Sequence, residues 1–388
     1  GKAYQPVPMG DGQTFALRVQ ASRTFRVYSL NFSEPWLGGR KPVRFNLSLS
    51  RTQQFLASFS NTGRVQVNRD QQFSITGISL GLAKRVQWPD DFFTISHSLS
   101  YQLYDFENYR TGLFNFGNGT SNSLAYTIGI SRSSAGPGRI YPLTGSIFEV
   151  TAKFTPPYSL FSDKDFKSLR ERSEELSEKR ATEGLTADEL TELETVDQER
   201  FKWLEFYKIK FKGDWYTRLV EKLVLRTNIE FGFLGNYNAD VGKVPFERFF
   251  LGGDGLGRNF TLDGRETIQL RGYENNSLTP VDPITNQQEG GIVYNKYSME
   301  LRYPLTLKPS ASIYALGFLE AGNSFNNFQE FNPFQIKRSA GVGLRIFMPA
   351  FGLLGIDFGY GFDEDLRPSA VGQGPSGWQT HFIIGQQF

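Results

Sequence analysis

An apolar period of two recurs along most of the chain, and it restricts the fold more than any other feature of the sequence. Near the start of the chain, apolar Phe15, Leu17 and Val19 occupy every second position. Polar Arg18 and Gln20 occupy positions that alternate with them. Successive side chains of a β-strand point to opposite faces, so such a segment is a strand with one apolar and one polar face. Its recurrence predicts an all-β chain.

About fourteen longer segments share this pattern, and glycine and proline fall between them. Proline cannot donate to a strand ladder, so this punctuation supports hairpins that follow one another in sequence order. The short segment 246–252 would make a fifteenth strand. The fourteen longer segments are residues 13–24, 25–36, 42–56, 71–85, 91–106, 120–133, 145–156, 202–213, 222–235, 292–304, 312–325, 336–348, 353–362 and 378–388.

The composition favours a membrane protein built from strands. Aromatic residues make up 15% of the chain although hydrophobic residues reach only 39%, and no run of apolar residues is long enough for a membrane helix. A closed antiparallel barrel pairs every backbone group in lipid, with apolar side chains outward and polar side chains inward. A large soluble β-protein is the alternative. The side chains expected inward include Arg226, Glu230, Glu300, Arg302, Glu320, Arg345 and Asp357.

Most catalytic and metal chemistry lacks the necessary residues. The chain has no Cys and only two His, His97 and His381, so we expect no metal, no cofactor and no enzymatic activity. A formal charge of +2 gives no sign of a nucleic-acid partner. Residues 77–81 match the G-x-S-x-G pattern of hydrolases, but they lie in an alternating strand instead of a strand-to-helix elbow. A barrel lipase or protease is therefore a minor alternative.

Residues 162–202 interrupt the strand pattern with helical spacing. Thr186 and Glu189 form a capping-box pattern ahead of an apolar periodic run. The segment carries 13 acidic and 8 basic side chains, so we expect a solvated helical loop. Docking of a partner is an open alternative.

The second long loop, residues 253–291, contains an arginine between apolar and glycine residues. Arg271 in this position can turn back into a barrel lumen to meet a carboxylate, and strand alternation places Glu300 and Glu320 on the inward face. The alternative is a surface arginine in an exposed loop.

Five motifs in chain order resemble the BamA family of outer-membrane β-barrel assembly proteins. Leu270–Tyr273 is similar to the family's V-R-G-F/Y loop motif. Phe318–Gly322 is similar to a barrel-wall motif in which the family has aspartate at the position of Glu320. The flanking matches are Phe32–Trp36, Arg248–Gly253 and Ser339–Arg345.

The resemblance implies a transmembrane antiparallel barrel across residues 1–388, with fourteen of the family's sixteen strands present. Residues 253–291 then correspond to the family's sixth loop, and segment 246–252 becomes part of that loop. A signal peptide and periplasmic POTRA domains are expected upstream. The resemblance also implies that the loop tip, residues 271–273, is held inside the lumen by contacts with the barrel wall. The residues of this expected lock are Arg271, Gly272, Tyr273, Glu300, Glu320 and Gly322.

The function implied by the resemblance is that of the central subunit of an assembly machinery in the Gram-negative outer membrane. A lateral seam between the first and last strands would accept strands of unfolded β-barrel substrates, with lipoproteins, other subunits and outer-membrane lipids as partners. Gly385 would allow a kink in the last strand, and Phe382 and the terminal Phe388 would face lipid. A secretion or translocation barrel of the same superfamily is the main alternative, and a porin is a weaker one.

Overall fold

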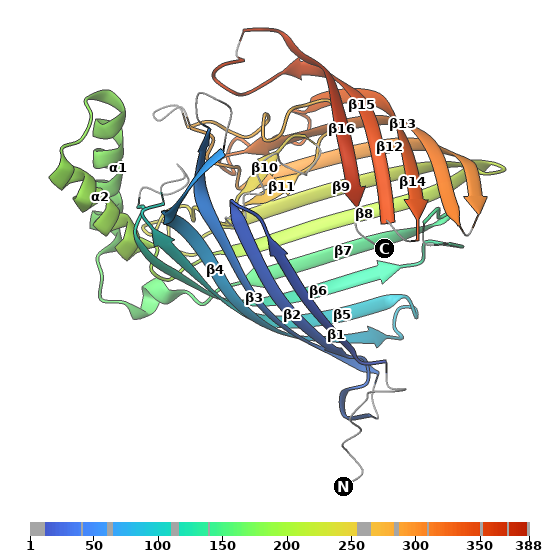
Figure 1. Cartoon of the computed structure of the whole chain (residues 1–388), viewed down its shortest axis with the longest axis horizontal. Helices are drawn as coiled ribbons and strands as arrows, with labels where there is room; N and C mark the ends of the chain where they lie inside the picture. Colours follow the sequence, from blue (N-terminus) through green and yellow to red (C-terminus); the bar gives the residue numbers. More distant parts are fainter. Residues whose placement is uncertain are drawn as a thin grey trace. The chain divides into compact units, whose positions relative to one another are not determined.

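Fourteen strands are hydrogen-bonded in the order in which they occur along the chain (Figure 1). The computed structural model describes residues 12–39, 42–59, 65–109, 116–138, 140–253, 265–282, 287–308, 310–349, 352–370 and 372–385. The first seven strands are β1 (Thr14–Ala21), β2 (Phe25–Glu34), β3 (Val43–Phe59), β4 (Val65–Val86), β5 (Phe93–Glu107), β6 (Gly119–Ser133) and β7 (Gly145–Phe154). The other seven are β8 (Tyr207–Val220), β9 (Leu223–Gly235), β12 (Val293–Lys308), β13 (Ala311–Phe325), β14 (Lys337–Met348), β15 (Gly352–Glu364) and β16 (Pro375–Gly385).

The prediction of an all-β fold with fourteen strands is confirmed. Segment 246–252 is no fifteenth strand of this sheet, because β10 (Phe249–Leu251) instead pairs in parallel with β11 (Glu266–Ile268). Predicted boundaries were also wrong at β4, which begins at Val65 instead of residue 71, and at β8, which spans Tyr207–Val220 instead of residues 202–213. Ahead of β8, Trp203 forms a bridge with Asn122 instead of continuing the β8 strand. Residues 77–81 lie within β4, as the alternation predicted.

The chain divides into two compact units, which we describe separately. The first comprises Gly1–Ile130, Thr151–Lys208 and Gly235–Phe246. The second comprises Ser131–Val150, Ile209–Leu234 and Glu247–Phe388.

Strand alternation in the second unit separates an apolar outer face from a polar inner face. On β12, Met299 and Leu301 are exposed, whereas Ser298 and Glu300, which alternate with them, are buried. The strand register places neighbouring residues of β13 on the same faces, so Leu319 is exposed and Glu320 is buried. Arg345 and Asp357 are buried as well. The predicted orientation is therefore confirmed for these residues.

The inner face of the first unit also buries aromatic side chains, which the alternation did not predict. The ring centroids of Phe73 and Phe106 lie 4.6 Å apart, and those of Tyr104 and Phe246 lie 4.2 Å apart. Phe246 belongs to the segment that follows β9, so a loop supplies the apolar surface against which the strand aromatics pack. Burial of several aromatic side chains contributes substantially to the stability of this unit.

A similar arrangement occurs in the second unit, where the turn between β6 and β7 packs against the strands. Tyr141 from this turn forms a buried cluster with Val224, Tyr314, Leu316 and Phe318. The Tyr141 hydroxyl lies 2.9 Å from the Lys222 carbonyl oxygen and 2.8 Å from the Arg302 carbonyl oxygen. The inner face is thus polar around Glu300 and apolar beside Tyr141.

Helices α1 (Phe166–Thr182) and α2 (Ala187–Arg200) lie inside the segment for which a helical insertion was expected, and they stand side by side (Figure 1). Thr186 and Glu189 form the predicted capping box at the start of α2. Leu176 and Leu193 are buried, as expected for two helices that share an apolar contact. In the described part of the chain, no helix is long and apolar enough to cross a membrane.

Polar contacts hold this helical hairpin together and attach it to the segment after β9. The Ser173 hydroxyl donates to Asp197 at 2.6 Å, and Arg200 donates to the same carboxylate at 2.8 Å. Arg200 also donates to the carbonyl oxygen of Val241 at 3.0 Å, and Arg170 donates to that of Ala239 at 2.9 Å. The hairpin therefore has a fixed place in the first unit.

We expect the helical hairpin to open more easily in acid. Hydrogen bonds from Lys179, and from the backbone and hydroxyl of Thr186, lower the pKa of Glu189 from 4.5 to about 2. Because the folded-state pKa lies below the ordinary value, the carboxylate stabilises the hairpin above pH 4.5, and this contribution is lost as the pH falls towards 2. Amide hydrogen exchange in α1 and α2, corrected for intrinsic exchange rates, should become faster over this range.

The control is a matched pair of variants. Glu189→Gln should make hairpin opening less dependent on pH, whereas Glu171→Gln, on the exposed surface of α1, should leave the dependence unchanged. An identical pH profile in Glu189→Gln and the parent protein would contradict the assignment.

Candidate functional site

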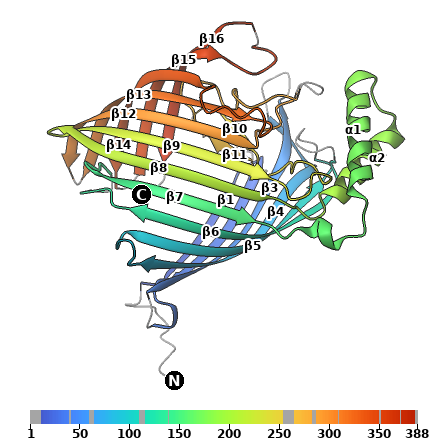
Figure 2. The same cartoon turned by 180° about the vertical axis from the view of Figure 1, so that it is seen from behind.

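Within the loop between β9 and β12, two short strands pair with each other ahead of Arg271. Phe249, Phe250 and Leu251 of β10 pair with residues 266–268 of β11, and Gly253 then bridges to Leu270 (Figure 2). All three β10 residues are buried. This short parallel pair brings the segment 270–273 to a defined position, next to the strands of the second unit.

The guanidinium group of Arg271 is buried among three carboxylates from three strands. Its Nη2 atom lies 2.7 Å from Oε1 of Glu300 on β12 and 2.6 Å from Oε1 of Glu320 on β13. Its Nη1 atom lies 3.3 Å from Oδ2 of Asp357 on β15. The Arg271 backbone N–H also donates to Glu320 at 2.8 Å. The planar guanidinium has enough donors to bind several carboxylates at once.

Phe318 forms one wall of this site. The Arg271 guanidinium carbon lies 3.8 Å from the centroid of the Phe318 ring. A cation in this position is attracted by the negative face of the ring, most strongly where water is excluded. Phe318 and Glu320 are two residues apart on β13, so alternation places both side chains on the same face.

Further ion pairs surround these contacts. Arg345 binds Asp357 through two hydrogen bonds of 2.7 Å each. Arg226 lies 2.6 Å from Asp214 and 3.3 Å from Glu300, to which Arg302 also binds. With Arg271, these pairs join four guanidinium groups to four carboxylates, and their formal charges cancel. Such compensation allows ionised groups to stay buried.

Gly272 places the loop tip directly against the strand backbone. Its N–H donates to Nε2 of His381 on β16 at 2.9 Å. Its φ angle is +86°, and a Cβ atom there would lie 2.8 Å from Ser339 Cβ and 3.0 Å from the Tyr360 carbonyl carbon. A Cβ atom on Gly359 would in turn lie 2.7 Å from the Gly272 nitrogen. Glycine is therefore required on both sides of this contact.

Tyr273 extends the contact to β14 and β15. The tyrosine is fully buried, and its hydroxyl donates to the Arg338 carbonyl oxygen at 2.6 Å. The same hydroxyl accepts a hydrogen bond of 3.3 Å from the Asp363 N–H. Segment 271–273 therefore contacts β12, β13, β14, β15 and β16.

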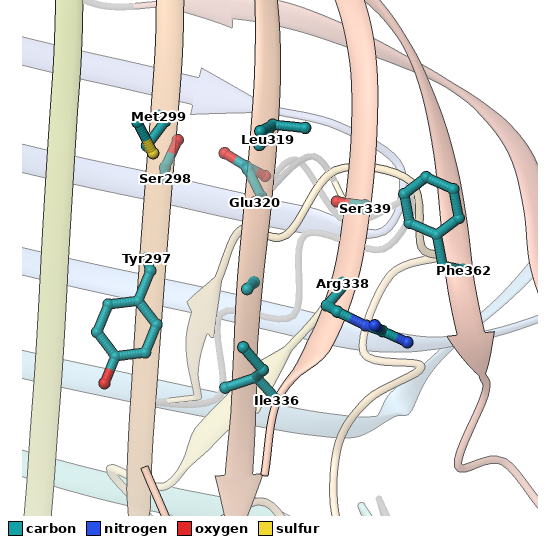
Figure 3. A pocket seen from close by; sticks show the side chains of 10 residues that line it. Tyr297, Ser298, Met299, Leu319, Glu320, Ile336, Arg338, Ser339 and Phe362 are labelled. Carbon is teal, nitrogen blue, oxygen red and sulfur yellow. The ribbon is translucent and has the colours of Figure 1, made fainter. Parts of the chain in front are cut away.

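Glu320 lies in a row of buried polar residues across three strands. It pairs with Ser298 on β12 and with Ser339 on β14 (Figure 3). A cavity of about 570 Å³ adjoins this row, and apolar Met299, Leu319 and Phe362 also line it. Glu320 is the Arg271 partner that contributes to this lining.

The residues proposed from sequence divide into two groups. The structure brings Arg271, Gly272, Tyr273, Glu300 and Glu320 together. The others lie elsewhere. Gly322 is two residues beyond Glu320, and a Cβ atom there would lie 2.7 Å from the Asn295 carbonyl oxygen. Phe382 is 58% exposed, Gly385 ends β16 opposite Leu353, and Phe388 lies outside the described residues.

Sequence reasoning missed several members of the site. Asp357, Arg345, Arg226 and Arg302 were expected to face inward, but they were not assigned to the Arg271 site. His381 was considered as one of the two histidines of the chain, and no partner was assigned to it. Alternation is the signal that could have suggested these residues, because each lies on the inner face of its strand. Within the described ranges, no group of three His, Cys, Asp or Glu residues could hold a metal ion.

A model of the Omp85 superfamily domain matches residues 9–388. No curated protein matches the chain. Among solved structures, BamA from Haemophilus ducreyi lacking POTRA domains 1–3 is 14% identical with a TM-score of 0.60, and the match covers 96% of this chain and 64% of that one. CdiB from Escherichia coli is 11% identical with a TM-score of 0.53, covering 92% and 52% of the two chains.

CdiB from Acinetobacter baumannii is 12% identical with a TM-score of 0.50, covering 95% of this chain and 53% of that one. This chain therefore spans less than two thirds of the length of each of these three structures. At these identities, the likeness is one of fold.

We expect Arg271→Ala to release the loop tip. The substitution leaves Glu300, Glu320 and Asp357 without a shared cation, and removal of one partner from a buried ion pair costs about 3–5 kcal/mol. Limited proteolysis should cut the loop faster in the variant, and its unfolding midpoint in urea should fall. Arg218→Ala, which removes an exposed arginine from β8, is the control. Equal proteolysis of the two variants would contradict a role for Arg271 in holding the loop.

A pair of glycine variants separates backbone strain from steric overlap. Gly272 and Gly372 have φ angles of +86° and +80°, but nothing lies within 4 Å of a Cβ atom built on Gly372. Left-handed backbone costs an alanine about 1–2 kcal/mol at either position. Only Gly272→Ala also overlaps Ser339 and Tyr360, so it should destabilise the protein more than Gly372→Ala in the same urea titration. Equal effects would mean that the close approach at Gly272 is unimportant.

Proposed function

Because the chain belongs to the Omp85 superfamily of outer-membrane β-barrels, we propose that it is the barrel of a protein that folds and inserts other β-barrel proteins into the outer membrane. In this proposal it is the central subunit of an assembly machinery in a Gram-negative bacterium. Unfolded β-barrel proteins are the substrates, and the reaction makes and breaks hydrogen bonds between strands without covalent chemistry.

The observation that carries the proposal is the state of the two end strands of the sheet order, β1 and β16. Seven of the eight β1 residues are exposed, so this strand has little side-chain packing to hold it. The edge of a sheet offers backbone N–H and C=O groups to which an extended segment can pair. An incoming substrate strand would use these groups as a template at a lateral seam between the first and last strands.

The last strand combines an apolar outer face with an anchored inner face. Trp378, Phe382 and Ile384 are exposed, whereas His381 is buried and bonded to the loop tip. Gly385 stands at the end of the ladder with β15, where a glycine permits a bend. We infer that the end of β16 moves during insertion while the part around His381 stays in place.

The loop tip would act as a lock in this scheme. Arg271 binds Glu300, Glu320 and Asp357 on three strands, and Gly272 reaches β16 through His381. These contacts would keep β12 to β16 together as one wall while strands exchange at the seam. The proposed partners are POTRA domains of the full-length protein, lipoproteins and other assembly subunits, and outer-membrane lipids.

A secretion barrel is the second candidate, because CdiB shares the fold. Export of a passenger would require a free path along the inner face. In the second unit the loop tip and Tyr141 pack on that face, so they would have to leave it first. A porin would face the same requirement.

The test is a folding assay with the full-length protein in liposomes. We expect it to accelerate the folding of an unfolded β-barrel substrate relative to empty liposomes, and Arg271→Ala should lose much of this acceleration because the wall is no longer held. Arg218→Ala should behave like the parent protein. A large steady conductance without any acceleration would contradict the insertase and favour a transport barrel.

A further inference from the structure

Two large apolar side chains are displayed on a short turn that follows β7. This 3₁₀ turn, η2 (Tyr158–Phe161), lies between the end of β7 and helix α1. Leu160 is 75% exposed and Phe161 is 83% exposed. Exposure of this much apolar surface to water is unfavourable, so we expect these two side chains to contact something other than water.

Contacts to the segment ahead of β8 hold the turn in place. The Ser159 N–H donates to Glu205 Oε2 at 2.7 Å, and the Ser159 hydroxyl donates to Oε1 at 3.1 Å. Glu205 is only 2% exposed. The Tyr158 ring packs against the Trp203 ring with their centroids 4.8 Å apart. The turn is therefore fixed, and it presents Leu160 and Phe161 outward in a defined position.

Trp203 connects the turn to the outer face of β6. The Asn122 N–H donates to the Lys202 carbonyl oxygen at 2.9 Å, and the Leu204 N–H donates to the Asn122 carbonyl oxygen at 2.8 Å. Trp203, between them, is 40% exposed. Further along β6, Tyr126 and Ile130 are exposed on the side of Asn122, because residues an even number apart share a face.

Through Tyr158 and Trp203, the turn is thus joined to the outer face of β6. Phe154, the last residue of β7, is exposed as well. In a membrane barrel of this superfamily such outer faces meet lipid, and aromatic residues gather where the hydrocarbon region ends. The turn leaves β7 at its loop end, which is where this boundary is expected.

We propose that Leu160, Phe161 and Trp203 insert into the headgroup boundary of the lipid bilayer and anchor the helical hairpin α1–α2 to the membrane surface. Exposed Lys202, next to Trp203, suits the anionic phosphates of lipid headgroups. The anchor depends on the superfamily's membrane location and not on the insertase activity. The occupant of this surface is lipid, and a protein subunit in its place is the competing outcome.

Because the sequence contains no Cys, a single introduced Cys can be labelled with a fluorophore, and this permits a direct test. The full chain is reconstituted into vesicles of phosphatidylcholine and phosphatidylglycerol, with an environment-sensitive fluorophore at Phe161→Cys or, as the control, at Glu178→Cys on α1. The label at position 161 should emit at shorter wavelength and lose fluorescence when lipids carry a quencher near their headgroups. The label at position 178 should respond to iodide in the water instead.

Equal quenching of the two labels by iodide, with none by the lipid quencher, would overturn the proposal. A label at position 161 that is shielded from both quenchers would also overturn it, and would point to a protein subunit over the turn. Because neither readout involves substrate folding, an inactive insertase would leave the result of this test unaffected.

A double variant tests whether the contact anchors the hairpin. Leu160→Ser with Phe161→Ser changes side chains that are exposed, so the barrel itself should keep its near-ultraviolet circular dichroism. Amide exchange in α1 and α2 should become faster in vesicles. Phe334→Ser, which changes an 88% exposed side chain in the loop after β13, is the control and should leave that exchange unchanged. Unchanged exchange in the double variant would refute the anchoring role.

Discussion

The buried charge of Arg271 is the interaction on which the arrangement of the second unit depends. A guanidinium group cannot remain away from water without compensating carboxylates, and here these come from β12, β13 and β15. The three strands must be in register for Glu300, Glu320 and Asp357 to meet at one point. Because neighbouring arginines neutralise the same carboxylates, a shift of one strand would leave several charges unpaired.

The inner face of each unit carries packed apolar side chains as well as polar ones. In the first unit, Phe73 and Tyr104 lie among aromatic rings that include a side chain from the segment after β9. In the second, Tyr141 closes an apolar cluster next to strands whose other inner residues carry charge. Loops and turns supply much of this packing.

Much of the fold can be predicted from the sequence, because a period of two identifies both the strands and their faces. The same alternation placed Glu300 and Glu320 on the inner face, within reach of a loop arginine. It could not select Asp357 or His381 as partners of the loop tip, since alternation states which face a residue occupies and not which distant segment lies above it. The pairing of β10 and the aromatic packing on the inner faces were missed for the same reason. Both depend on which strands the loops pack against.

The contacts of the loop tip also bear on the order in which the protein folds. Arg271 and Asp357 are separated by 86 residues, and Gly272 and His381 by 109. Contacts between residues so far apart form late, since closing a long loop costs entropy before any contact compensates for it. The tip therefore finds its complete set of partners only after the final hairpins have joined the sheet. A seated loop tip would therefore mark a finished C-terminal wall.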